Sequence, residues 1–198
     1  MRISHWLAIS ALVVGGSALC GGASAAAAPA PAAPPILEKC TICHGEQGVS
    51  AEATYPTIAG LPVKLQMDAL RAYRDGTRDC GPVPRMCKIV VGMTDDQIKE
   101  LATHFAAFPY KPAAQPFKAE LVEKGRQLHE DYCSVCHGES PADADKSILH
   151  GQWAEYLRYA IGQYRSGHRK QPPTMRRQTE KLSDQDIDAL VNFYASYR

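Results

Sequence analysis

The sequence has almost no net charge, no alternating strand pattern and, beyond its first residues, no long apolar run. Its 198 residues carry 22 Lys and Arg against 21 Asp and Glu, which leaves a formal charge of +1. A chain without an excess of positive charge has no field that attracts phosphates, which removes the electrostatic argument for nucleic-acid binding. Because no segment alternates polar and apolar residues convincingly, the predicted fold class is all-α.

The first residues predict export rather than a part of the fold. The uncharged apolar stretch 6–19 is followed by Ala23-Ser24-Ala25, which has the small-x-small pattern of a cleavage site. We therefore predict a signal peptide over 1–25 and an extended Ala/Pro-rich leader over 26–35. The apolar stretch has 14 residues, whereas a bilayer span needs about 20, although an uncleaved anchor remains the alternative. Export places the protein in the periplasm, an oxidising compartment, and removes Cys20 with the signal peptide.

Beyond the leader, the sequence is a tandem repeat. A Cys-x-x-Cys-His-Gly-Glu motif begins at Cys40 and again at Cys133. A Tyr-Arg-x-Gly segment ends at Gly76 and again at Gly167, and a capped helix start occurs at Thr94 and again at Ser183. They keep one order, at separations of 93, 91 and 89 residues, and so indicate two copies of one domain. We place the first copy at 36–108 and the second copy at 117–198, joined by a Pro-containing linker at 109–116.

Each copy is expected to be helical. Apolar residues recur at spacings of three and four over 61–73 and 153–164, and 117–132 predicts a further helix that opens the second copy. Thr94 and Ser183 are predicted N-caps of the last helix in each copy. A Gln three residues after Thr94 completes a capping box, whereas the Asp three residues after Ser183 only approximates one.

Each copy also contains the attachment motif of a large prosthetic group. About 75 to 85 residues are marginal for an apolar core alone, and a buried haem would supply the missing interior. In Cys-x-x-Cys-His the two thiols form thioethers with one haem, and the adjacent His faces its iron. The alternatives for such cysteines are a redox dithiol, half of a zinc site or structural disulfides. Export, the following His and the second copy favour two haem c groups, held by Cys40, Cys43, Cys133 and Cys136, with His44 and His137 on the irons.

A methionine in each copy is the predicted sixth iron ligand. Met86 precedes Met175 by 89 residues, the separation of the capped helices, and both follow Pro-containing stretches. Met67 and Met93 fit packing better. Methionine ligation raises the reduction potential, which suits an electron carrier. Two saturated irons leave no open position for peroxide or ligand chemistry, so no catalytic site of its own is expected.

The remaining polar groups have two interpretations each. Cys80 and Cys87 lie on either side of Met86, and a disulfide that closes this loop is the favoured interpretation; a free thiolate on the iron is the alternative. His104, His129, His150 and His168 are expected to pack or lie on the surface. The basic run 165–181 is either a solvated face that also pairs with haem carboxylates, or a docking patch for an acidic redox partner.

These motifs place the chain among the tandem class I cytochromes c. It most resembles the dihaem cytochrome subunits of flavocytochrome c sulfide dehydrogenases, on residues 110–113, 128–129, 132–137, 148–153, 156–157 and 193–196. The resemblance implies a FAD-containing sulfide dehydrogenase flavoprotein partner that passes electrons to the first haem. Electrons would then go to the second haem and on to a small soluble acceptor such as a cytochrome c. The Cys80–Cys87 pair departs from that family's pattern.

Two other functions remain open. A stand-alone dihaem shuttle that feeds a terminal oxidase would share fold, ligands and compartment with the subunit. An obligate subunit should instead present an apolar patch on the first copy, where its partner binds. An enzyme in its own right, such as a thiosulfate-oxidising cytochrome or a peroxidase, would need a vacant or Cys-ligated iron.

Overall fold

The computed structural model describes residues 36–80, 85–138 and 146–198. The predicted signal peptide, the leader and Cys20 lie outside these residues. The described part of the chain contains α-helices and no strand, as expected. Its helices are α1 (Leu37–His44), α2 (Val63–Arg74), α3 (Arg85–Val90), α4 (Asp95–Ala106), α5 (Ala119–Tyr132), α6 (Ala154–Arg165), α7 (Pro173–Thr179) and α8 (Asp184–Ala195).

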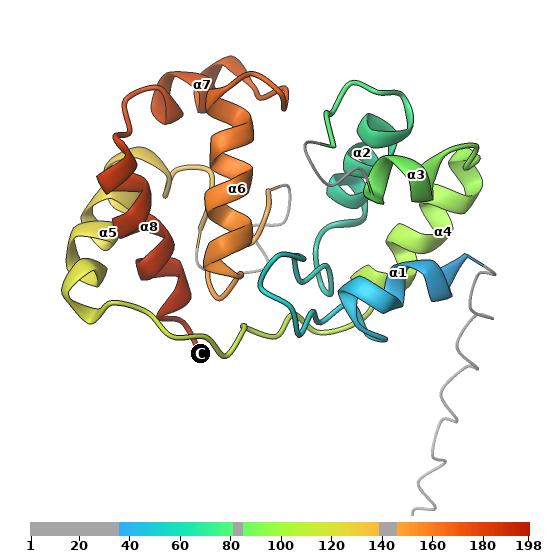
Figure 1. The fold of residues 1–198 in the computed structure, drawn as a ribbon, viewed down its shortest axis with the longest axis horizontal. Coiled ribbons are helices and arrows are strands. Elements are labelled where there is room, and N and C mark those ends of the chain that lie inside the picture. Colours follow the sequence, from blue (N-terminus) through green and yellow to red (C-terminus); the bar gives the residue numbers. More distant parts are fainter. Residues whose placement is uncertain (1–35, 81–84, 139–145) are drawn as a thin grey trace, which may run out of the picture. The chain divides into compact units, whose positions relative to one another are not determined.

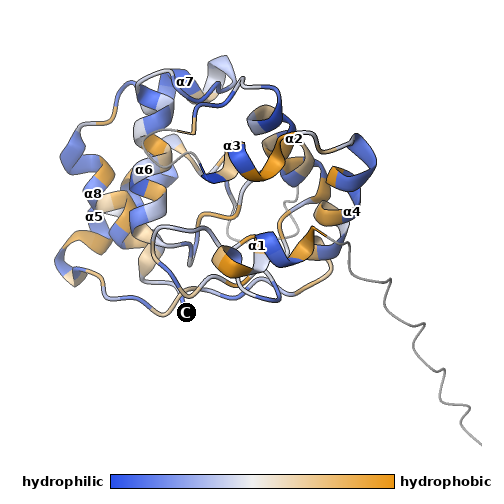
Figure 2. Cartoon of the chain, turned by 45° about the vertical axis from the view of Figure 1, so that its right-hand side comes forward, coloured by the Kyte–Doolittle hydropathy of each residue, from blue (hydrophilic) through white to orange (hydrophobic). Residues whose placement is uncertain are grey.

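The same order of four helices occurs in each copy (Figure 1). In the first copy α2 packs against α3 and α4, and in the second copy α6 packs against α7 and α8 while α5 lies along α8. Each copy has one apolar core. The buried residues of the first core are Val90, Met93, Ile98, Leu101 and Phe105. Those of the second core are Leu157, Leu182, Ile187, Leu190, Val191, Phe193 and Tyr194. Figure 2 shows apolar residues along α1, α3 and α4 in the first copy.

The last helix of each copy starts at a complete capping box. The Thr94 side chain accepts a hydrogen bond from the Gln97 N–H, and the Gln97 side chain accepts one from the Thr94 N–H. Ser183 and Asp186 make the same reciprocal pair, so the expectation that Asp186 only approximates a box was wrong. The shorter Asp side chain still reaches the N-cap N–H, at 3.0 Å.

The short helices α3 and α7 were not predicted. They carry Met86 and Met175, within segments for which the sequence indicated only Pro-containing stretches. In α7 the reason is plain, because Pro173 occupies the first helical position, where its fixed φ suits a helix and its missing N–H costs nothing.

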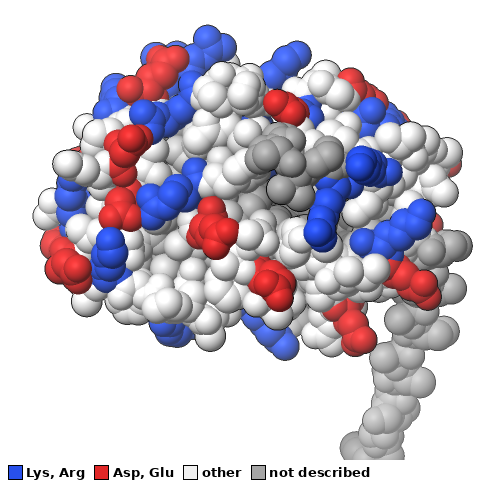
Figure 3. All heavy atoms as spheres, viewed as in Figure 1, with Lys and Arg blue, Asp and Glu red and all other residues white. Residues whose placement is uncertain are grey.

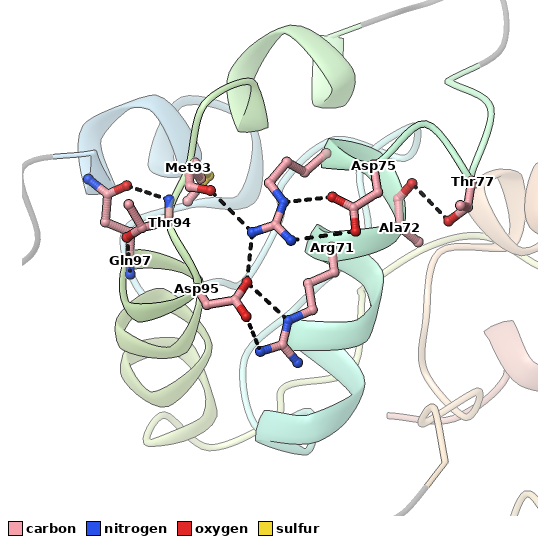
Figure 4. A network of polar contacts seen from close by, with 9 residues as sticks. Arg71, Ala72, Asp75, Thr77, Met93, Thr94, Asp95 and Gln97 are labelled. Atoms are coloured by element: carbon pink, nitrogen blue, oxygen red, sulfur yellow. Dashed lines mark hydrogen bonds and ion pairs between the residues drawn. The ribbon is translucent and has the colours of Figure 1, made fainter.

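Two arginines of α2 hold the start of α4 (Figure 4). Arg74 donates to the Met93 carbonyl at 3.2 Å and to Asp95 at 2.7 Å, and Arg71 donates to Asp95 at 3.0 Å. The Arg74 guanidinium, followed by that of Arg71, lowers the pKa of Asp95. An exposed network of this kind adds little stability for each pair, but it fixes where the core residue Met93 lies.

The linker packs against the second copy. Ala113 is buried, and its N–H donates to the Gly151 carbonyl at 2.7 Å. Gly151 has a φ of +73°, and a Cβ built there would lie 2.5 Å from the Pro112 side chain. Glycine is therefore required at this position for both reasons.

The two copies are joined by buried hydrogen bonds. Gln152 is 2% exposed, and its side chain pairs with the backbone of Thr57 in the first copy. The Trp153 indole N–H donates to the Ser50 carbonyl at 3.1 Å. Gln152 and Trp153 therefore connect residues about a hundred positions apart.

The surface carries charges of both signs. In Figure 3 the Lys and Arg side chains are interspersed with Asp and Glu over the visible face, in line with a net charge of +1. None of the helices in the described ranges is long and apolar enough to cross a membrane.

Candidate haem-binding sites

The first copy contains a cavity of about 510 Å³. Its lining includes Cys40, Cys43 and His44 of α1 and Met86 of α3. Apolar residues make up much of the remaining wall: Ile58, Leu61, Leu65, Leu70, Ile89, Val90, Leu101 and Phe105. The predicted attachment and ligand residues of the first haem thus face one apolar space of a size that suits a cofactor.

The motif histidines are held in one orientation. His44 Nδ1 lies 2.8 Å from the Pro56 carbonyl, and His137 Nδ1 lies 3.1 Å from the Ser147 carbonyl. A carbonyl only accepts, so Nδ1 carries the proton in both rings and the Nε2 lone pair is free for an iron. Burial lowers the pKa of both imidazoles and keeps them in the neutral form that ligates metal.

The motif cysteines are not paired with each other. Cys40, Cys43, Cys133 and Cys136 carry free thiols, which disfavours the structural-disulfide alternative. Burial, followed by the neighbouring Cys43, raises the pKa of Cys40 to about 11. Within the described residues no group of three or more His, Cys, Asp and Glu side chains could hold a metal ion.

The cavity contains two methionines. Met86 is half-buried on α3, whereas Met93 is 5% exposed and belongs to the core of the first copy, although it also lines the cavity. Comparison with the second copy distinguishes the two methionines. Met175 on α7 is the counterpart of Met86, whereas the counterpart of Met93 is Leu182, a core residue that cannot ligate iron. The repeat therefore favours Met86 and Met175 as a matched pair.

A disulfide joins Cys80 to Cys87, with 6.1 Å between their Cα atoms. Cys80 lines the cavity, and the Cys87 N–H donates to the Cys80 sulfur at 3.0 Å. The link closes the segment that leads to Met86. Both sulfurs are consumed in it, so a thiolate from either cysteine is not available to an iron.

The second copy completes the wall of the first copy's cavity with Arg169 and Tyr156, which meet Arg78 there. Arg78 and Arg169 pair their backbones in an isolated antiparallel bridge, and their guanidiniums stack on Tyr73 and Tyr164 at 4.2 and 4.4 Å. Burial by itself raises the pKa of Tyr156, but the charges of Arg169 and Arg78 outweigh it and lower this pKa to about 8.

This arginine pair fits the acidic groups of a haem. Arg78 is 7% exposed, and in the described part of the chain neither guanidinium forms an ion pair with a carboxylate. Buried cations normally have an anionic partner, and haem carries carboxylates at its edge. Sequence reasoning missed this cluster, although the matched Gly-x-Arg at 76–78 and 167–169 signals it.

The basic run 165–181 divides into two sets. Arg169 turns inward to the cluster just described, and Arg165 pairs with Asp184 at 2.6 Å. Lys170, Arg176 and Arg177 are exposed, and the last two directly follow Met175. Both interpretations of the run therefore apply, to different residues.

Comparisons with known proteins agree with this arrangement. The family model described as cytochrome c oxidase, cbb3-type, subunit III matches residues 120–193. A thiosulfate dehydrogenase electron acceptor of Thiomonas intermedia is 31% identical in an alignment of 179 residues that covers 83% of this chain and 81% of the relative. Cytochrome c4 of Thiocapsa roseopersicina is 29% identical in an alignment of 170 residues that covers 78% of this chain and 84% of the relative.

Solved structures show the same fold. Reduced recombinant cytochrome c4 from Pseudomonas stutzeri matches with a TM-score of 0.69 at 23% identity, over 84% of this chain and 98% of that chain. Cytochrome c4 from Acidithiobacillus ferrooxidans matches with a TM-score of 0.68 at 22% identity, over 80% of this chain and 99% of that chain. At these identities the likeness concerns the fold alone.

Proposed function

Because this chain belongs to the family of dihaem c-type cytochromes, we propose that it is a periplasmic electron shuttle between a thiosulfate-oxidising dehydrogenase and a terminal oxidase. The protein is all-α, with two tandem class I cytochrome c domains that each bind one haem c covalently. The observation that carries the proposal is the match, over both copies, to a thiosulfate dehydrogenase electron acceptor.

Haem iron supplies a one-electron couple, and the chain holds and tunes it. Cys40 and Cys43 would hold the first haem through thioethers, and His44 Nε2 and the Met86 sulfur would ligate its iron. Cys133, Cys136, His137 and Met175 would do the same in the second copy. Thioether ligation favours ferrous iron and raises the potential relative to bis-His ligation. Ligation by His and Met leaves no open position, which argues against peroxide or thiosulfate chemistry on this chain.

The apolar wall of the first cavity would keep water from the iron, while the arginine pair would hold the haem carboxylates. Arg78 comes from the first copy and Arg169 from the second, so the residues that would receive these carboxylates lie where the copies meet. The Tyr156 hydroxyl faces both guanidiniums there, and their charges lower its pKa.

Exposed basic residues beside Met175 offer a docking surface for an acidic redox protein. Lys170, Arg176 and Arg177 would speed encounter with such a partner and align it with the second haem. Charge reversal in R176E/R177E should slow electron exchange with an acidic partner severalfold at low salt and little at high salt. K99E/K111E, with the same change in net charge away from α7, is the matched control. Equal effects of the two variants would contradict the docking surface.

The sulfide dehydrogenase interpretation is weaker than the shuttle. Gln152 and Trp153, which carried much of that resemblance, join the two copies to each other, so they need no flavoprotein to explain them. Apolar exposure is also not special to the first copy. Ile42 is 81% exposed and Val135, at the same motif position of the second copy, is 97% exposed.

A reconstitution with purified proteins tests the proposal. The oxidised holoprotein is mixed with a thiosulfate dehydrogenase and thiosulfate, and separately with a sulfide-oxidising flavoprotein and sulfide, while the visible spectrum is recorded. We expect rapid reduction of both haems in the first mixture only, and a holoprotein that elutes as a monomer. A stable, stoichiometric complex with the flavoprotein, reduced by sulfide, would overturn the shuttle in favour of the subunit.

A further inference from the structure

The interior of the second copy is polar at positions where the first copy is apolar. The same hydrogen bond identifies the equivalent residues, because the Gly60 N–H donates to the Phe105 carbonyl at 3.0 Å and the Gly151 N–H donates to the Tyr194 carbonyl at 2.8 Å. Tyr194 therefore stands where the first copy has Phe105. The separations of 93, 91 and 89 residues between the copies give three further pairs of first-copy and second-copy residues, which are Ile36 and His129, Ala59 and His150, and Phe108 and Tyr197.

The polar residues form one buried cluster. His129 is 3%, His150 is 4% and Tyr194 is 2% exposed. His129 Nδ1 lies 3.0 Å from the Tyr194 hydroxyl, and the two imidazole centroids are 4.9 Å apart. The Tyr197 ring packs on His150, with 4.3 Å between centroids.

This cluster lies against the haem attachment. Cys133, the first attachment cysteine of the second copy, packs on the core that contains Tyr194, and its N–H donates to the His129 carbonyl at 2.8 Å. In the first copy Phe105 brings no hydroxyl to the equivalent place. The first copy does have His104 on α4, and this half-buried ring packs on the apolar rings of Phe105 and Phe108, with 5.2 Å between centroids.

We propose that the second copy takes up a proton together with its electron, and that the His129–His150 pair is the acceptor. An electron from the donor protein or an added reductant converts ferric to ferrous iron in the second haem. A proton from water converts one neutral imidazole of the pair to imidazolium. The reduced haem has one positive charge less, so the new charge on the imidazole is compensated and the interior stays close to neutral.

The groups around the pair allow this exchange. Burial raises the pKa of Tyr194 well above its usual value, so the phenol stays protonated and serves only as a hydrogen-bond bridge. Cys133 does not titrate once it is bonded to haem. On the other side, His150 lines a cavity of about 480 Å³ together with Tyr110, Tyr197 and Arg198, and this cavity gives water a route to the ring.

The surroundings of the two imidazoles differ, and this difference bears on which of them takes the proton. Burial raises the pKa of Tyr110, which stays neutral, while the Arg198 guanidinium on the His150 side disfavours a second positive charge there. His129 lies on α5, whose neighbouring Glu130 and Arg126 pair with each other at the surface. We assign the imidazolium to His129, the ring bonded to Tyr194, with His150, which lines the cavity, as the route to water.

The consequence is a pH-dependent potential for one haem. Loss of positive charge at the iron raises the affinity of the pair for a proton, so its pKa is higher in the reduced than in the oxidised protein. Between these two pKa values the potential of the second haem falls as pH rises, by up to about 59 mV for each tenfold fall in proton concentration. Outside that window it is constant.

The test is a redox titration of the purified holoprotein, without partners, at intervals between about pH 5 and pH 9. Its outcome is independent of the physiological donor, so it stands apart from the test of the shuttle. We expect one of the two haem waves to shift with pH, and proton uptake on full reduction in unbuffered solution to match that shift. Two waves that are both flat across the range would overturn the proposal.

Three variants assign the effect. His129→Gln keeps a polar side chain opposite Tyr194 but does not titrate here, and it should flatten the sloping wave while leaving the fold and the other wave unchanged. His150→Ala introduces the residue that the first copy has at this position, and it should slow proton uptake. His104→Phe introduces the residue that the second copy has at the matching position; it is the control and should leave the slope intact. Persistence of the slope in His129→Gln would contradict the assignment, and nitrogen-15 imidazole NMR of the wild type, oxidised against reduced, tests it without any substitution.

Discussion

The Gln152 side chain is paired on both sides with the backbone of Thr57, 95 positions away in the sequence. Its Nε2 donates to the Thr57 carbonyl and its Oε1 accepts from the Thr57 N–H, each at 2.9 Å. The side chain thus replaces a backbone partner at the junction of the copies. Gln115 extends the junction into the linker, by donating to the Gln152 carbonyl at 2.9 Å.

Gln152→Leu should weaken this junction. It leaves the buried N–H and carbonyl of Thr57 without their partners, and each costs about 1–3 kcal/mol of unfolding free energy. The loss is measured by denaturant unfolding of the holoprotein. Gln127→Leu on the exposed face of α5 is the control and should change stability little. Equal stability of Gln152→Leu and wild type would show that the junction contributes nothing.

Gly125→Ala should push α5 away from α8. A Cβ at this position would overlap the Ala189 carbonyl oxygen and lie 2.6 Å from the Phe193 Cβ, and overpacking of this kind costs about 1–3 kcal/mol. Gly162→Ala on α6 is a matched control, because nothing lies within 4 Å of its added Cβ. Removing a helical glycine there should stabilise by about 0.5–1 kcal/mol. Thermal unfolding compares the two, and the opposite order of stability would be a contradiction.

Replacing either proposed sulfur ligand should change one haem only. Met86→His and Met175→His substitute imidazole for thioether, and each should lower the potential of the haem in its own copy. Potentiometric titration followed in the visible spectrum detects the shift. Met67→Leu and Met93→Leu are the controls. A large shift in Met93→Leu, with Met86→His unchanged, would move the first ligand to Met93.

Loss of the disulfide should loosen the first copy. A double substitution, Cys80→Ser with Cys87→Ser, opens a loop between residues seven apart, which in the chain-entropy treatment costs about 2–3 kcal/mol. Unfolding of the holoprotein should show the first copy melting earlier and the second unchanged. Wild type treated with a thiol reductant should reproduce this behaviour. A simultaneous loss in both copies would contradict a local role.

The capping box of α8 should respond to acid. The bond from Lys124, followed by that from Ser183, lowers the pKa of Asp186 to about 2. A carboxylate with a lowered pKa in the folded state stabilises it above its ordinary pKa near 4, and this contribution is lost as pH falls toward about 2. Asp186→Asn should therefore be less stable than wild type at neutral pH.

Acid unfolding of the two proteins measures this difference, which should shrink between about pH 4 and pH 2. Asp184→Asn, whose side chain is 93% exposed, is the control. A difference that persisted at pH 2 would mean that the amide disturbs packing rather than charge. Ser183→Ala should cost about 1 kcal/mol by loss of the same cap.

Local chemistry explains what could be predicted from the sequence. The all-α class, the helices α2, α4, α5, α6 and α8, and two covalent haem groups follow from periodicity, caps and the Cys-x-x-Cys-His motif. In each of these signals the interacting residues lie within a few positions of one another, so spacing alone is informative. The assignment of Met86 and Met175 as iron ligands rests on the comparison of the two copies. It stays a prediction, which the potentiometric titrations of the methionine variants test.

The tertiary structure decided what depends on residues far apart. That Gln152 and Trp153 join the copies, that Arg169 faces Arg78 across the junction, and that His129 and His150 meet beside Tyr194 follows from no local pattern. Such groups are positioned by the packing of helices from different parts of the chain, and their energies depend on burial, which one-dimensional spacing does not encode. The sequence by itself determined the cofactors and the class of fold, whereas the surroundings that tune each haem were decided only by the folded chain.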